Sequence, residues 1–455
     1  MKRKLSTLER LIDANICYRV ALEGEIDADR LRSAIDRVQR KHPMLRMAIR
    51  DVDGEPHYAL DPALRVPLRA VEWVSAEHRE RECETETYGA FPPDQPQLRV
   101  VWLRRAEAAD VACDELLVTS THRVCDGMSM FTIVRELLRW LHSDQEPVPY
   151  TPPTVADIVG DLRDGRSGKQ RMAARLVNAV FALIPASRRP LVNRELRLEW
   201  ALDAAASERL KRRCRREGVP LHAAMLVALG EALAVLGKRA PDWIESPIDA
   251  RRGRLPALKD DMLFFGGGSF KLASKQDPRR DFWERARAAA AEMREKIERD
   301  IAEIPGKYQF CEMLRVPPAG KLRSIVRLGD AVSRNGNWNR ISLSNLGNVT
   351  LDEEAAPLRV RDFTVYVHSF AIRSLGILAY MLHGRLRFIY IGDETCLDRA
   401  RAEAIGRAFT GLLGDCAGRG EADAPAAARA DAGALAHPDD PRQAERILPG
   451  ALPRS

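Results

Sequence analysis

The strongest constraint on the fold is the stretch Thr121–Gly127, Thr-His-Arg-Val-Cys-Asp-Gly, which stands between a strand pattern and a helix pattern. The apolar run Leu116–Val118 precedes it, and apolar residues from Met128 to Leu141 follow at helical spacing. A sharp turn must therefore join strand to helix, and it lifts the imidazole of His122 out of the sheet edge. The aspartate and glycine that end the stretch supply the hydrogen bonding and the permissive backbone that such a turn needs.

The chain is too long for one core, because 455 residues exceed the size at which a single core stops growing. Two domains of about 200 residues each are expected. The hydrophobic fraction of 45% and the charged fraction of 30% are typical of a soluble globular protein. Residues 418–455 differ: Ala, Asp, Arg and Pro dominate without periodicity, which predicts a disordered tail.

The net charge of +7 and the pI near 9.0 favour acidic partners. Nucleic acid is not expected among them, because only 6% of residues are aromatic and no basic run is interleaved with aromatic residues.

The eight cysteines form no Cys-x-x-Cys pair and no Cys/His spacing suited to zinc, so no metal is expected and a reduced, cytoplasmic protein is predicted. The amino terminus lacks the apolar core of a secretory signal, and no apolar stretch of about 18 residues is evident. Membrane contact is therefore expected to be at most peripheral.

The first 160 residues read as an α/β layer. A capping box, Ser-x-x-Glu, begins at Ser6, and Asp53-Gly54 marks a hairpin turn. Strands are predicted at Ile16–Leu22, Leu45–Arg50, His57–Leu60, Leu98–Leu103 and Glu115–His122, with a helix from Asp27 to Pro43.

Residues 161–195 are basic around the apolar insert Leu176–Ile184, which is shorter than a membrane span. This crossover or lid is either a solvated helix with one buried face, or a segment that contacts lipid or an acidic partner.

Residues 196–417 repeat the α/β pattern. Strands are expected at Leu196–Leu202, Trp243–Ile248, Asn339–Leu343, Val365–Phe370, Ile377–Leu382 and Leu386–Ile391. Helices are expected at Ser207–Glu217, His222–Leu236, Asp281–Ile301 and Leu397–Leu413. The strand at Asn339–Leu343 is expected to run into a turn at Ser344–Asn348.

The stretch Thr121–Gly127 resembles the His-His-x-x-x-Asp-Gly signature of the superfamily that contains chloramphenicol acetyltransferase, nonribosomal peptide condensation domains, polyketide-associated acyltransferases and wax ester synthases. Thr121 replaces the first histidine of the signature. Lys41–Arg46 resembles the Arg-His-x-x-Leu-Arg segment of condensation-like proteins, and Pro247–Arg251 and Ser342–Gly347 fit as well. The resemblance runs from Leu5 to about Asp415.

The resemblance implies an α/β fold of two chloramphenicol-acetyltransferase-like sandwich subdomains in a V-shaped pseudo-dimer. Residues 1–160 and 196–417 would form the subdomains, 161–195 the crossover, and a tunnel between them would hold His122 at its middle. His122 would be the general base, a role that suits an imidazole with a pKa near the working pH. Ser344 and Asn345 would lie opposite and stabilise the oxyanion.

The resemblance gives the other motif residues structural roles. Asp126 would pair with an arginine to hold the turn, with Arg251 as the best match and Arg46 as the second. Gly127 would allow the close helix start, and Thr121 would serve only in packing or hydrogen bonding.

Rival interpretations use the same residues. Cys125 could be a thiol nucleophile, although no acidic orienting group is evident, and His122 with Asp126 lacks a third metal ligand. His122 could also be a structural histidine in a retired active site. His222, at the start of its helix, is the one other histidine expected near the tunnel, and Gly266–Gly268 lacks the context of a phosphate loop.

The resemblance thus implies an acyltransferase that moves an acyl group from a phosphopantetheine thioester to a hydroxyl or amine of a small-molecule or lipid acceptor. The donor would be an acyl or peptidyl carrier protein or coenzyme A, with no permanently bound cofactor. The alternatives are a noncatalytic module that binds a carrier protein, and a lipid-directed acyl-CoA:alcohol acyltransferase with the Leu176–Ile184 insert as a membrane-facing lid. A monomer is expected, since one chain would hold both halves of the tunnel.

Overall fold

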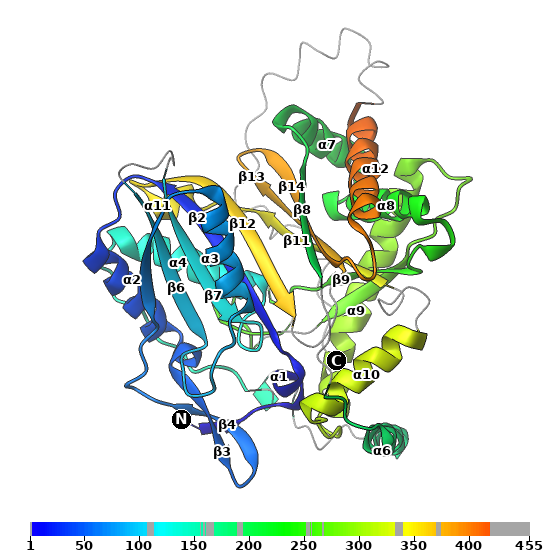
Figure 1. Ribbon diagram of the computed structural model, residues 1–455. Coiled ribbons are helices and arrows are strands. Elements are labelled where there is room, and N and C mark those ends of the chain that lie inside the picture. Colours follow the sequence, from blue (N-terminus) through cyan, green and yellow to red (C-terminus); the bar gives the residue numbers. More distant parts are fainter. Residues whose placement is uncertain are drawn as a thin grey trace, which may run out of the picture.

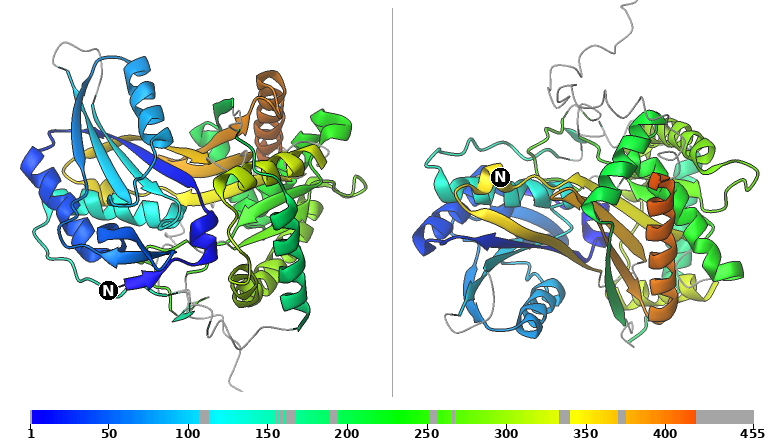
Figure 2. Two further views of the ribbon diagram at one scale, coloured as in Figure 1. Left: turned by 60° about the horizontal axis from the view of Figure 1, so that its bottom comes forward. Right: turned by 90° about the horizontal axis from the view of Figure 1, so that it is seen from above.

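The computed structural model describes residues 2–106, 113–154, 156–157, 160, 168–188, 194–251, 255, 257–265, 268–332, 340–369 and 375–418 (Figure 1). The predicted tail from residue 419 onward lies outside the described residues, as do Gly266 and Gly267. Two α/β units lie side by side, each built on its own sheet, which confirms the predicted fold class (Figures 1 and 2).

The first unit is a five-stranded sheet with helices on both faces. Its strand order is β12 (Arg359–Ser369), β2 (Ala14–Glu23), β7 (Asp114–Thr121), β6 (Leu98–Arg105) and β5 (Leu68–Trp73). Alternate residues of β2 point to opposite faces. Tyr18 and Val20 join the core beneath α2 (Ala28–Lys41) and α4 (Gly127–His142), whereas Cys17 packs in a smaller cluster with Cys83 of α3 (Ala76–Tyr88).

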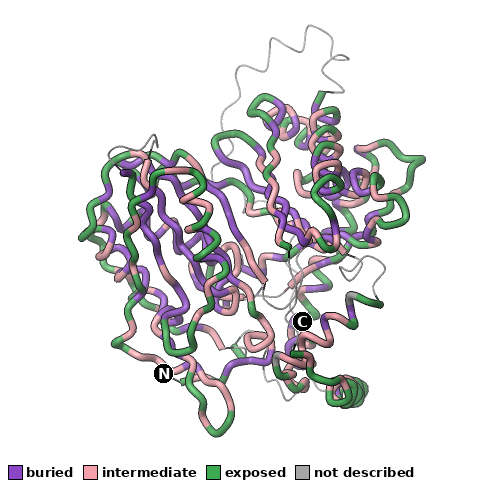
Figure 3. The backbone as a smooth tube through the Cα atoms, viewed as in Figure 1, coloured by how far each residue is buried: buried purple, intermediate pink, exposed green. Residues whose placement is uncertain are grey.

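The second unit is a six-stranded sheet. Its order is β10 (Ser269–Ala273), β9 (Trp243–Pro247), β11 (Arg340–Asn348), β13 (Gly376–Leu382), β14 (Arg385–Asp393) and β8 (Glu195–Ala201). Its core includes side chains of α7 (Ala204–Arg216), α8 (Leu221–Ala232), α9 (Phe282–Cys311) and α12 (Arg399–Gly418). Figure 3 shows buried backbone concentrated in the strands of both units. Helix α9 passes Pro305 and continues ten residues beyond its predicted end at Ile301.

Three short strands form a separate small sheet in the order β1 (Lys2–Lys4), β4 (Glu55–Leu60) and β3 (Met47–Val52). The turn between β3 and β4 has positive φ at Asp53 and Gly54, as the hairpin signal predicted. The predicted capping box at Ser6 starts α1 (Thr7–Leu11). The remaining described elements are η1 (Pro43–Arg46), α6 (Gly168–Leu183), η2 (Leu233–Arg239), α10 (Ala319–Val332) and α11 (Asp352–Ala355).

Strand β12 connects the two units. It lies in the range 196–417 that the sequence assigned to the second subdomain, but it pairs antiparallel with β2 of the first sheet. Asp362 of β12 accepts hydrogen bonds from both Arg19 of β2 and Arg387 of β14. Burial alone would raise the pKa of Asp362, but the two guanidinium groups lower it below its ordinary value. The second part of the chain therefore completes the first sheet.

One described helix, Leu221–Arg239, is long and apolar enough to cross a membrane by length and composition, which corrects the expectation that no such stretch exists. Half of its most apolar window is buried inside the protein. Residues 223–229 are all buried and belong to the core of the second unit, as in the core helix of a globular domain.

Candidate active site

The turn between β7 and α4 holds the candidate site. Strand β7 ends at Thr121, and the backbone N–H of His122 still donates to the Ala14 carbonyl of the neighbouring strand (2.7 Å). Asp126 is the N-cap of α4, and its Oδ1 accepts from the backbone N–H of Ser129 (2.8 Å). The predicted sequence of strand, turn and helix is therefore present, with His122 at the first position beyond the sheet.

The turn orients the imidazole of His122. Its Nδ1 lies 2.8 Å from the carbonyl oxygen of Cys125, and a carbonyl only accepts, so Nδ1 carries the hydrogen and Nε2 keeps a free lone pair. The ring of Phe265 packs edge-to-face on the imidazole, with centroids 4.9 Å apart. Desolvation lowers the pKa of His122 below its ordinary value, although the charge of Asp126 and the bond to Cys125 oppose this shift. The ring is thus a neutral base at neutral pH.

Asp126 forms the ion pair that the sequence predicted with Arg251. Its Oδ2 accepts from the guanidinium Nη1 (2.7 Å), and the Arg251 side chain is only 3% exposed. Arg46 lies in η1 and forms no ion pair with Asp126 in the described part of the chain. A buried guanidinium needs such a partner, so the pair holds the start of α4 against the segment before Arg251.

Arg251, Ser129 and Asp126 also bind the chain segment that contains Phe264. Arg251 Nη2 donates to the hydroxyl of Ser129 (2.7 Å) and to the carbonyl of Phe264 (3.3 Å). The backbone N–H of Phe264 donates to Ser129 Oγ (3.0 Å), and its carbonyl accepts from the N–H of Asp126 (3.1 Å). The hydrogen bonds at Phe264 position the next residue, Phe265, against the imidazole.

A second buried network holds this segment from the other side. His42 is fully buried, with Nε2 2.7 Å from Glu136 and Nδ1 3.0 Å from the hydroxyl of Tyr150. That hydroxyl accepts from the backbone N–H of Leu263 (2.8 Å), and Lys41 pairs with the same Glu136. Lys41 and His42, which belong to the stretch that resembles the family's Arg-His-x-x-Leu-Arg segment, therefore help to hold the chain at Leu263 in place.

Thr121 and Gly127 differ in how tightly they are constrained. Thr121 is buried, but among the described residues its hydroxyl makes only long contacts, to the N–H of Arg123 (3.4 Å) and the carbonyl of Ala14 (3.5 Å). A Cβ on Gly127 would lie 3.0 Å from Leu346 Cδ2 and 3.3 Å from the hydroxyl of Tyr18. Gly127 therefore allows Leu346 of strand β11 to pack closely against the motif, where a larger residue would be crowded.

Ser344 and Asn345 lie inside β11, not in the turn that the sequence predicted. The strand continues to Asn348 with a bulge after Asn345, where Gly347 has a φ of +77°. The Oδ1 of Asn345 accepts from the N–H of Gly347 (2.9 Å), and the residue lines a cavity of about 340 Å³ with Pro220 and Leu221 of the second unit. The bulge accommodates the turn-forming residues without ending the strand.

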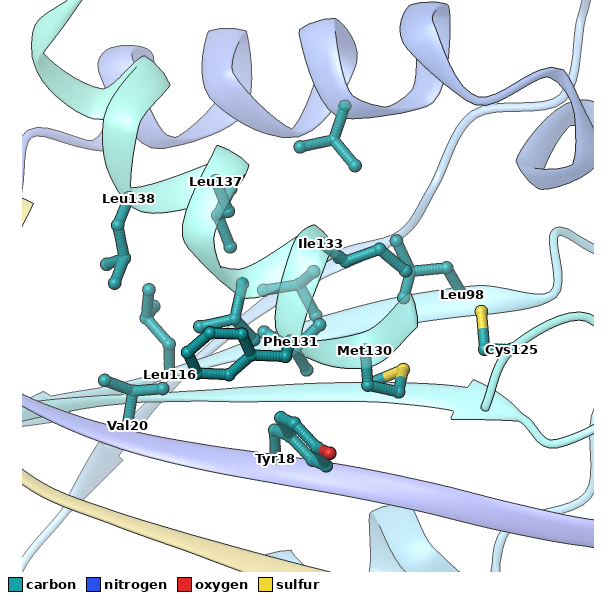
Figure 4. Packing of buried hydrophobic residues seen from close by; sticks show 14 of the residues in the cluster. Tyr18, Val20, Leu98, Leu116, Cys125, Met130, Phe131, Ile133, Leu137 and Leu138 are labelled. Atoms are coloured by element: carbon teal, nitrogen blue, oxygen red, sulfur yellow. The ribbon is translucent and has the colours of Figure 1, made fainter. Parts of the chain in front are cut away.

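Cys125 and His222, the other two residues considered for the site, are both desolvated by the protein. Cys125 is fully buried, and burial raises the pKa of its thiol to about 12, which argues against a thiolate nucleophile. Figure 4 shows Cys125 among the apolar side chains of the first core, near Met130. His222 Nε2 lies 2.7 Å from Ser246 Oγ, and burial lowers its pKa to about 4.

Tyr18, Ser129, Phe265 and Leu346 lie against the motif and were not predicted. The hydroxyl of Tyr18 donates to the Gly127 carbonyl (2.8 Å), and the others make the contacts described above. Only Ser129 carries a sequence signal, because it stands three residues after the N-cap Asp126. The other three come from distant segments.

The fold is shared with solved structures. One is the epimerization domain from the third module of tyrocidine synthetase B, with a TM-score of 0.66 and 15% identity, covering 92% of this chain and 96% of that chain. Another is a trichothecene 15-O-acetyltransferase from Fusarium sporotrichioides, with a TM-score of 0.63 and 12% identity, covering 91% and 95%. At these identities the likeness is one of fold.

Curated relatives match parts of the chain. Chondramide synthase of Chondromyces crocatus is 31% identical over 167 residues, which is 34% of this chain. Malpinin synthetase of Mortierella alpina is 26% identical over 264 residues, or 54% of this chain. The chain spans only 4% and 3% of the lengths of these relatives. The family model for the condensation domain matches residues 14–262, more than half of the sequence, and the chain therefore belongs to the condensation domain family.

Proposed function

We propose that this protein transfers an acyl group from a phosphopantetheine thioester to a hydroxyl or amine, with His122 as the general base. The donor would be an acyl or peptidyl carrier protein or coenzyme A, and the acceptor a small molecule. One observation carries the proposal: the hydrogen bond from His122 Nδ1 to Cys125 leaves Nε2 as an acceptor on a neutral ring.

In the proposed reaction, Nε2 takes the proton of the acceptor as its oxygen or nitrogen attacks the thioester carbonyl. The tetrahedral oxyanion then collapses, the carbon–sulfur bond breaks, and the imidazolium returns the proton to the leaving thiolate. The protein forms no covalent intermediate, and a new ester or amide and a free thiol are the products. Ser344 and Asn345 remain the proposed oxyanion donors: the Oδ1 of Asn345 accepts from the N–H of Gly347, so Nδ2 is the donor that its side chain would offer.

Mass spectrometry of products tests the proposal. The wild-type chain and His122→Ala would be incubated with acyl carrier proteins, acyl-CoA donors, and hydroxyl and amine acceptors. We expect His122→Ala to reduce product formation by a factor of about 10² to 10⁴, with an unchanged circular dichroism spectrum. His142→Ala is the matched control, since His142 is exposed at the end of α4, the helix that follows the motif. Normal turnover by His122→Ala would refute the mechanism.

A second candidate is a noncatalytic module that binds a carrier protein. Thr121 supports it, because this residue departs from the family's first motif histidine at the centre of the site. Binding of an acyl carrier protein without turnover, equal in wild type and His122→Ala, would favour the module.

Because none of the eight cysteines is in a disulfide, we also propose a reducing, cytoplasmic location; thiol labelling of protein taken directly from cells tests it.

A further inference from the structure

Helix α6 carries an apolar stripe on the side that faces away from the protein. Met172, Leu176, Val180 and Leu183 recur every three or four residues, so they share one helix face. Their exposed fractions are 69%, 67%, 46% and 84%. Figure 3 shows this helix as largely exposed at the edge of the molecule. We call these four residues the α6 face.

The opposite side of the helix is fixed to the protein. Ala174 is buried, and the Asn178 side chain donates to the Met313 carbonyl (2.9 Å) and accepts from the N–H of Arg315 (2.8 Å). Lys321 of α10 donates to carbonyls of the last helical turn, including that of Ala182 (2.7 Å). Rotating α6 to bury the α6 face would break these bonds, so within the described part of the chain the apolar stripe stays exposed.

Basic residues flank the stripe. From Gly168 to Arg188 the sequence has four basic residues and no acidic residue. Lys169, Arg171 and Arg175 are exposed on α6 beside the apolar side chains. The neighbouring α10 also has exposed apolar side chains near its end, Leu328 and Val332, but the proposal below rests on α6 alone. An apolar helix face bordered by Lys and Arg is complementary to the acyl and headgroup layers of an anionic bilayer.

We propose that the α6 face is a peripheral membrane-binding surface, which inserts its four aliphatic side chains into the interface of an anionic bilayer. A lipid surface fits better than a protein partner, because the stripe has no aromatic anchor, whereas protein hot spots are rich in Trp, Tyr and Arg. Exposed flexible aliphatic chains suit a fluid acyl layer. Membrane binding would keep the catalytic unit near lipid-borne substrates, but it does not depend on the proposed acyl transfer.

Vesicle flotation of the full chain tests the proposal. Two vesicle types would be compared, phosphatidylcholine alone and phosphatidylcholine with about 30 mol% phosphatidylglycerol. We expect the wild type to bind the anionic vesicles and Leu176→Ser/Leu183→Ser to bind them about tenfold more weakly. Lys169→Gln/Arg175→Gln should also lose binding, and the size of that loss should depend on the salt concentration. Val148→Ser is the matched control, since Val148 is an exposed apolar residue outside α6. These variants remove exposed side chains, so their circular dichroism should match the wild type.

Several outcomes would overturn the proposal. Failure of the wild type to float, or equal flotation of the Leu176→Ser/Leu183→Ser variant, would do so directly. If that variant instead lost binding to an acyl carrier protein, or changed from dimer to monomer in sedimentation velocity without any vesicle binding, the α6 face would be a protein interface. His122→Ala should float as the wild type does, which separates this result from the test of acyl transfer.

Discussion

The Nδ1 of His122 donates a hydrogen bond to the carbonyl oxygen of Cys125, 2.8 Å away in the same turn. This bond selects the tautomer whose Nε2 is basic, and the ring of Phe265 packs edge-to-face against the same imidazole.

The pH dependence of acyl transfer should therefore show an acid limb below the ordinary histidine pKa of about 6.5. Desolvation lowers the pKa of His122, so the ring is neutral and active above that lowered value and loses activity as the pH falls through it. The measurement is kcat/KM between about pH 4.5 and 8.5, compared with the pH stability of the fold over the same range. A midpoint above 6.5 would contradict the lowering of the His122 pKa by desolvation.

The pair Asp126–Arg251 should contribute to stability as a unit. Arg251→Met removes a buried guanidinium and leaves the Asp126 carboxylate unpaired, at a cost of roughly 3 kcal/mol. The double variant Asp126→Asn/Arg251→Met should be more stable than the sum of the single losses predicts, by roughly 0.5 to 3 kcal/mol. Urea unfolding of the four proteins gives the coupling. Strict additivity would show that the pair does not hold the turn.

Thr121→Val should be nearly neutral. In the part of the chain that the structure describes, the Thr121 hydroxyl makes only contacts of 3.4 and 3.5 Å, so its loss should change the unfolding free energy by less than about 1 kcal/mol. Thr121→His, which restores the family's motif, should overpack this buried position at a cost of roughly 1 to 3 kcal/mol. Thermal unfolding and product assays compare the variants. A stable and faster Thr121→His protein would contradict the packing argument.

Arg19→Met should destabilise the junction between the units by roughly 3 to 5 kcal/mol. Arg19 is buried between Glu115 (2.6 Å) and Asp362, and its removal leaves the buried Glu115 without its closest partner. Arg30→Met is the matched control, because the pair Arg30–Asp144 is exposed and should contribute at most about 1 kcal/mol. Similar urea midpoints for the two variants would show that the buried network is not important for stability.

Local sequence patterns were sufficient for the helices and strands that carry the site. The apolar periodicities of β2, α2, β7 and α4, the capping box at Ser6 and the Asp53-Gly54 turn each depend on residues a few positions apart. The motif also placed His122 at the sheet edge. The resemblance to the family implied Arg251 as the partner of Asp126, and the structure contains that ion pair. The fold class, which the same resemblance implied, was also predicted correctly.

Other features depend on contacts between distant segments, and periodicity carries no information about them. Strand β12 alternates like its neighbours, but only hydrogen bonding to β2 assigns it to the first sheet. The bulge in β11 replaced the expected turn because pairing with β13 stabilises the strand on both sides of Gly347. Phe265 and Leu346 reach the motif from segments more than 100 residues away, so tertiary packing decided the surroundings of His122. The position of His122 between a strand and a helix depends on neighbouring residues, and the local sequence pattern was enough to predict it.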